Sequence, residues 1–121
     1  MSHPDILSRA PGAAPHRIRT DEEALDIARQ LVPVFRHQAA ERDRHRILPW
    51  DEIERYTASG LGGITVPRAH GGADVSYATL AEVFVLLSAA DPSLGQIPQN
   101  HFAVLQLLRE TSLDRTQRFY V

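Results

Sequence analysis

The chain has 121 residues, of which 43% are hydrophobic, and its formal net charge is −2. This composition suits one compact globular domain with a modest core, and the charge gives no general attraction to nucleic acid, so we expect no nucleic-acid partner. The absence of cysteine excludes disulfides and thiolate chemistry, and the absence of lysine excludes a Schiff-base mechanism.

Residues 1–19 contain three prolines and no hydrophobic period, which predicts a mobile leader. This segment lacks the apolar centre of a secretory signal, and the chain contains no run of about 18 apolar residues. We therefore expect a cytoplasmic protein that does not enter a membrane.

Residues 20–46 place apolar side chains at a spacing of about 3.6 residues, which predicts a long amphipathic helix. Thr20 and Glu23 have the spacing of a capping box at its start. Pro33 removes one helical hydrogen bond. We expect it to kink this helix or to end a first segment.

Three more helices are predicted, over residues 49–59, 77–90 and 94–110, and Ser76 is the expected cap of the second of these. The segment 61–76 carries four glycines and one proline, so we expect an extended, loop-rich connection there. No long stretch of alternating apolar and polar residues is present. The predicted fold class is therefore all-α.

Two short motifs allow both a functional and a structural interpretation. His37, Glu41 and His45 recur at a spacing that could supply metal ligands from one helix face, but neighbouring arginines favour a solvated surface, and we expect no metal. The sequence 70-HGG-72 resembles an oxyanion-hole loop, yet the chain has no G-x-S-x-G nucleophile motif. A tight turn is the favoured interpretation of these glycines.

The stretch 95-GQIPQNH-101 places polar side chains between two strongly apolar runs. Gln96 and Asn100 share a helical face if the helix has begun by residue 96, and His101 lies beside them. Val104 and Leu107 extend neighbouring faces. Such a surface could line a pocket that is polar at one end and apolar deeper in, or it could be a capping cluster without a ligand. The residues alone leave both alternatives open.

The order of motifs over residues 51–102 resembles the N-terminal helical domain of the acyl-CoA dehydrogenase superfamily. The motifs are a helix ending in "SGL", a "VP…HGGAD" loop, an "AEV…LSAADPSLG" helix and turn, and "IPQNHF". Within this superfamily the sequence most closely resembles the branch of flavin-dependent monooxygenases and sulfur-acquisition oxidoreductases, which are dibenzothiophene monooxygenase-like. The resemblance implies a helical domain over residues 20–113 and the start, at residues 114–121, of a helix that leads to a middle domain. It also implies that the β-domain and the C-terminal four-helix bundle of this fold are absent from the chain.

The same resemblance implies a flavin cofactor, either FMN or FAD, which is bound mainly by the absent domains. It implies a homotetramer, a small organosulfur substrate and a possible flavin reductase partner. His101 and Asn100 would be the catalytic residues, because they would hydrogen-bond an oxygen-derived group on the flavin or donate a proton to it. Gln96, Val104 and Leu107 would line the flavin and substrate cavity. The alternatives are an acyl-CoA dehydrogenase that acts on a thioester and a helical module without catalytic activity.

Overall fold

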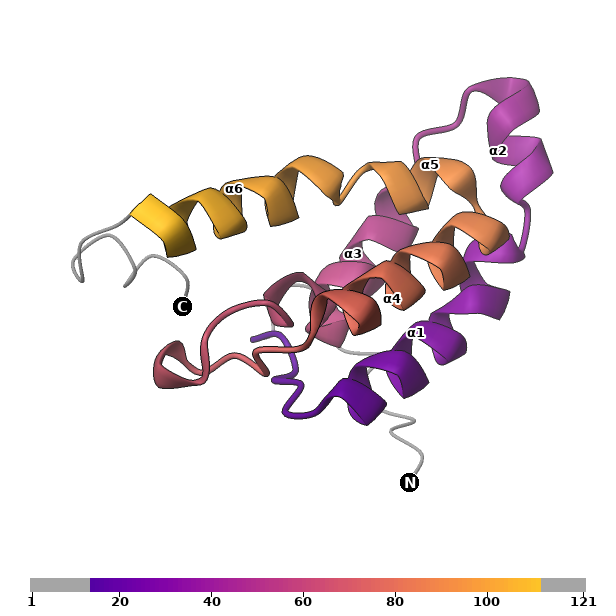
Figure 1. The fold of residues 1–121 in the computed structure, drawn as a ribbon. Helices are drawn as coiled ribbons and strands as arrows, with labels where there is room; N and C mark the ends of the chain where they lie inside the picture. Colours follow the sequence, from indigo (N-terminus) through magenta and orange to yellow (C-terminus); the bar gives the residue numbers. More distant parts are fainter. Residues whose placement is uncertain (1–13, 112–121) are drawn as a thin grey trace.

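The computed structural model describes residues 14–111, and the described chain is helical with no strand (Figure 1). The all-α prediction is therefore confirmed, whereas the predicted helix start at residues 114–121 lies outside the described residues. The helices, in chain order, are α1 (Asp21–Arg36), α2 (Ala39–His45), α3 (Trp50–Ser59), α4 (Tyr77–Ala90), α5 (Pro92–Gln96) and α6 (Gln99–Thr111). Two single 3₁₀ turns, η1 (Leu61–Gly63) and η2 (Arg68–His70), lie between α3 and α4.

Helices α1 and α4 form the most extensive helix pair, and α3 and α5 pack beside them (Figure 1). Helix α4 is apolar around most of its circumference: Val83 and Leu87 are buried against these neighbours, whereas Val85 is exposed. None of the described helices combines the length and hydrophobicity that crossing a bilayer would need. The core consists of buried residues from the helices and from both connecting segments: Ile18, Ala24, Ile27, Ala28, Leu31, Phe35, Leu61, Ile64, Ala73, Val75, Val83, Leu87, Ala90, Leu94 and Phe102.

The first predicted helix is broken, but not where the sequence indicates. Pro33 lies inside α1, which continues to Arg36. The break comes at Gln38, whose φ of 59° is left-handed and ends the helical path before α2. Helix α1 tolerates the proline because Leu31 and Phe35, on either side of it, are fully buried in the core. Their burial outweighs the one hydrogen bond that the proline removes.

Two other predictions differ from the structure in detail. The segment 61–76, expected to be extended, contains η1 and η2, and Gly71 ends η2 with a φ of +89° that favours glycine. The helix expected over residues 94–110 is divided into α5 and α6. Pro98 has no N–H with which to continue α5, and its carbonyl instead accepts the first bond of α6, from Phe102 N at 3.2 Å.

Residues 14–18 form an N-terminal strap that lies across the domain before α1 begins. The sequence predicts a mobile leader up to residue 19, but Ile18 is only 3% exposed and belongs to the core. The backbone N–H of His16 donates to Ala58 O at 3.0 Å. The imidazole of His16 pairs with Glu23 Oε1 through Nε2 at 2.6 Å. These contacts hold the described end of the segment against α3 and the start of α1.

Candidate functional site

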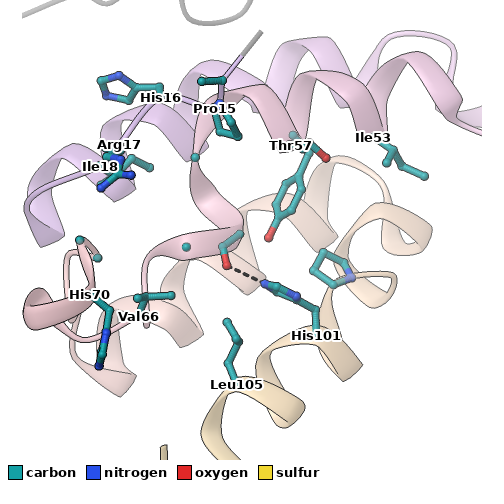
Figure 2. A pocket seen from close by; sticks show the side chains of 18 of the residues that line it. Pro15, His16, Arg17, Ile18, Ile53, Thr57, Val66, His70, His101 and Leu105 are labelled. Atoms are coloured by element: carbon teal, nitrogen blue, oxygen red, sulfur yellow. Dashed lines mark hydrogen bonds between the residues drawn. The ribbon is translucent and has the colours of Figure 1, made fainter. Parts of the chain in front are cut away.

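A pocket of about 560 Å³ lies between the strap, α3, the two 3₁₀ turns and the α5–α6 junction (Figure 2). Its size and its largely apolar wall are those of small-molecule sites in proteins. The apolar side chains that line it are Ala14, Pro15, Ile18, Ile53, Val66, Leu94, Ile97, Pro98 and Leu105. The lining residues come from segments far apart in the chain, so the pocket forms only when the domain folds.

Glycines keep the pocket open on the side of η1. Gly60 ends α3 with a φ of +86°, and a Cβ built there would lie 2.0 Å from His16 O, so only glycine lets the strap approach α3 this closely. Gly63 also lines the pocket, and a Cβ built there would meet no atom within 4 Å. The backbone at this turn therefore leaves space that a side chain would otherwise fill.

His101 is the predicted site residue that the structure places in this pocket. Figure 2 shows His101 and Leu105 pointing into it from α6, one helical turn apart. The Nε2 atom of His101 lies 2.6 Å from Gly62 O. A carbonyl oxygen can only accept, so Nε2 carries the proton and donates it. In the neutral ring the remaining nitrogen, Nδ1, is then an acceptor.

Tyr56 is a pocket residue that the sequence did not single out. It lies half-buried on α3, one turn after Ile53, and both side chains line the pocket. Burial raises the pKa of the Tyr56 phenol above its usual value, so the hydroxyl remains protonated at physiological pH. Among the described residues this hydroxyl has no hydrogen-bond partner. The apolar stripe that contains Ile53 and Tyr56 could have indicated the position, but only as part of the core.

The charged groups around the pocket are all potential cations. Its lining includes Arg17, His16, His70 and His101, and no aspartate or glutamate lines it within the described chain. A positively charged ligand group would therefore find no carboxylate there. A group that accepts hydrogen bonds, whether neutral or anionic, is the better match to this lining.

The other predicted site residues lie on a different face of α5 and α6. Gln96 and Asn100 are exposed, and the side chains of Val104 and Leu107 are 54% and 59% exposed. None of the four lines the pocket described above. Helix α6 begins only at Gln99, so Gln96 on α5 does not share a helical face with Asn100, as the sequence had allowed; we call these four exposed positions together the outer face of α6. That this face lines a flavin and substrate cavity stays a prediction.

Helix α6 has these two faces because its inner side is anchored at several points along its length. Phe102 is buried and packs edge-on against Phe84 of α4, with ring centroids 5.6 Å apart. Farther along, Arg109 Nη1 donates to Asp74 Oδ1 at 2.7 Å. These contacts fix the rotation of α6, so residues on its opposite side face away from the domain.

The two alternative motifs have structural roles. The break at residue 38 removes His37 from the helix that carries Glu41 and His45, and His45 Nε2 pairs with Glu41 Oε2 at 3.2 Å. Within residues 14–111 no group of three or more histidine and acidic side chains is arranged to hold a metal ion. In 70-HGG-72 the backbone N–H groups of both glycines donate within the turn, to Arg68 O and Pro67 O, so they cannot form an oxyanion hole.

Comparison with known proteins shows similarity over most of the chain. Residues 19–120 match the family described as "Acyl-CoA dehydrogenase, N-terminal domain". Dibenzothiophene monooxygenases of Rhodococcus erythropolis and Rhodococcus qingshengii are each 38% identical over 81 residues, which cover 67% of this chain and 19% of each relative. The dibenzothiophene monooxygenase of Mycolicibacterium goodii is 32% identical over 81 residues, or 67% of this chain and 20% of the relative. The matched region thus spans about one fifth of the length of these curated relatives. No solved structure gave a significant match.

Proposed function

The chain belongs to the acyl-CoA dehydrogenase N-terminal domain family, and we propose that it is the helical domain of a flavin-dependent oxidoreductase. The family match over residues 19–120 is the observation that carries this proposal. We further propose that the enzyme is a monooxygenase and that its substrate is a small organosulfur compound. The relatives named dibenzothiophene monooxygenase, at up to 38% identity, support this finer assignment.

The outer face of α6 is suited to contact one side of a flavin. It presents two carboxamides, those of Gln96 and Asn100, beside the exposed apolar side chains of Val104 and Leu107. A planar ring system with polar edges needs this combination of hydrogen-bonding and apolar groups. The flavin, as FMN or FAD, would supply the electron transfer and the reaction with oxygen. Its phosphate would be held outside the described residues.

Within this proposal, Asn100 and His101 have different roles. The exposed carboxamide of Asn100 can donate a hydrogen bond to a polar group at the flavin edge. His101 donates its Nε2 proton to Gly62 O, so this proton is already engaged within the domain. His101 would therefore hold α6 against η1, and only Nδ1 would be available to exchange a proton with a reacting group.

The test uses the protein encoded by the complete reading frame. We expect it to bind FMN or FAD stoichiometrically and to oxygenate an organosulfur compound such as dibenzothiophene when reduced flavin is supplied. Asn100→Ala should lower kcat/KM up to about tenfold, the effect of one lost hydrogen bond. Gln106→Ala is the matched control, because Gln106 is bonded to Glu110 within α6, and its turnover should not change. A complete protein that binds neither flavin would refute the proposal.

The family description itself favours a second candidate, the oxidation of an acyl thioester. An acyl-CoA thioester would then bleach the oxidised flavin in the absence of oxygen, and dibenzothiophene would not be oxygenated. In either case we propose a cytoplasmic homotetramer, which sedimentation would test. In the monooxygenase case a separate flavin reductase would supply the reduced cofactor.

A further inference from the structure

The pocket between the strap, α3 and α6 is partly open to solvent, and the residues that line it all belong to the described part of this chain. Its volume of about 560 Å³ falls within the range of small-molecule sites, and most of its wall is apolar. A ligand that covers this wall would remove apolar surface from water, which is favourable. The main body of a matching ligand is therefore apolar.

Tyr56 determines which polar group such a ligand should carry. Its hydroxyl lies in a half-buried position with no partner among the described residues, and its pKa is raised by burial, so it remains a donor. When an apolar ligand displaces water from this hydroxyl, the donor loses its hydrogen bond unless the ligand supplies an acceptor. The ring of Tyr56 lies near Gly62, on the side where His101 also approaches, so α3 and α6 both face this point.

The charges of the lining exclude one class of ligand. Arg17 and the imidazoles line the pocket, and no carboxylate among the described residues does so. A cationic group would be desolvated there without a counter-charge. Neutral or anionic acceptors, such as a carbonyl, a sulfoxide or a carboxylate, are compatible with the same surroundings.

We propose that this pocket is a binding site for a small, mainly apolar molecule that carries a hydrogen-bond acceptor, and that the Tyr56 hydroxyl donates to that acceptor. The site goes beyond the function proposed above, because it needs neither flavin nor any residue outside the chain.

The test is a titration of the 121-residue chain with three probes that share one apolar body. The probes are 2-acetylnaphthalene, naphthalene and 2-(aminomethyl)naphthalene, and tyrosine fluorescence or calorimetry reports binding. We expect 2-acetylnaphthalene to bind about threefold to tenfold more tightly than naphthalene, as one hydrogen bond provides. The ammonium compound should bind most weakly. Absence of saturable binding, or tightest binding of the ammonium compound, would overturn the proposal.

Two variants assign the binding to this pocket. Tyr56→Phe removes only the hydroxyl and should reduce the affinity for 2-acetylnaphthalene to that for naphthalene, with naphthalene unaffected. Tyr77→Phe is its matched control, since Tyr77 is 66% exposed and lies outside the pocket. Gly63→Leu places a side chain into open space at the pocket wall and should lower the affinity for both 2-acetylnaphthalene and naphthalene at least tenfold.

Thermal melting checks that each variant is folded before its affinity is interpreted. The assignment would be overturned if Tyr56→Phe lowered the affinities for 2-acetylnaphthalene and naphthalene equally. It would also be overturned if Gly63→Leu lowered neither affinity, because the probes would then bind elsewhere. Flavin binding and turnover are not among the readouts. If the probes do not bind, the oxidoreductase proposal is therefore unaffected. If the complete protein binds no flavin, the proposal of a binding site in this pocket is unaffected.

Discussion

Replacing Arg42 with alanine removes a guanidinium that joins three separate parts of the domain. The Arg42 side chain is 9% exposed. Its Nη2 atom donates to Phe35 O at 2.6 Å and to Asp91 Oδ2 at 2.8 Å. Its Nη1 atom donates to His37 O at 2.8 Å and to Glu52 Oε1 at 2.9 Å. One side chain thus connects the α1–α2 break with α3 and with the cap of α5, which precedes the pocket residues of the α5–α6 junction.

The loss of unfolding free energy in Arg42→Ala depends on how deeply the carboxylates that pair with Arg42 are buried. Removing one partner of a buried ion pair costs about 3–5 kcal/mol, because the other charge is left uncompensated. The Asp91 side chain is also only 9% exposed, although its Oδ1 still accepts from Ser93 N at 2.9 Å. Glu52 is 18% exposed and can recover water more easily. We therefore expect a loss of about 3 kcal/mol, the lower end of the range and a large part of the roughly 5–15 kcal/mol typical of a folded domain.

Urea unfolding followed by circular dichroism measures this loss. With a denaturant dependence of about 1–3 kcal/mol/M, the midpoint should fall by about 1–3 M. Arg42→Lys keeps the charge but not the fork of donors, so its midpoint should lie between those of the wild type and Arg42→Ala. Arg44→Ala is the control: Arg44 is 67% exposed and pairs with Glu41, and its loss should cost at most about 1 kcal/mol. If Arg42→Ala and Arg44→Ala shift the midpoint equally, the reasoning about the buried pair is refuted.

Two further predictions concern the strap and the acid stability of the domain. Gly60→Ala should lower the free energy of unfolding by about 1–3 kcal/mol, because φ is +86° and the new Cβ would lie 2.0 Å from His16 O. Gly63→Ala should change the free energy of unfolding by less than about 0.5 kcal/mol, and urea unfolding measures both variants. The hydrogen bond donated by the Thr79 hydroxyl lowers the pKa of Asp21 from its usual 3.8. A lowered native pKa stabilises the fold above about pH 4, and this contribution is lost as the pH falls through the native value. Asp21→Asn should therefore flatten the acid limb of the stability profile, and an unchanged limb would contradict this assignment.

Local sequence signals predicted the elements whose boundaries depend on neighbouring residues. Helix α4 has the predicted bounds, since Ser76 accepts from Thr79 N and Asp91 follows its last turn. Gly60 ends α3 in the left-handed conformation that glycine favours. Helix caps and glycine turns act over three or four residues, so the sequence alone contains the information that determines them.

Long-range packing decided what those signals could not. The sequence predicts that Pro33 kinks the first helix or ends a first segment; α1 does not end there but continues to Arg36, with Leu31 and Phe35 buried in the core. The strap shows no hydrophobic period, and its order comes from Ile18 and from a hydrogen bond to Ala58, about 40 residues away in the chain. Tyr56 belongs to a stripe that resembles core, and only the arrangement of α3 beside the strap, η1 and α6 makes it part of a pocket wall.

The sequence by itself determined the all-α class and the family, because helical period and motif order are written along the chain. The tertiary structure decided which side of α6 faces the domain. Burial of Phe102 and the bond from His101 to Gly62 O fix that rotation. They place His101 in the pocket and leave Asn100 on the outer face. Adjacent residues on a helix point about 100° apart, so contacts with distant segments, and not the local order of residues, assign each one to its surface.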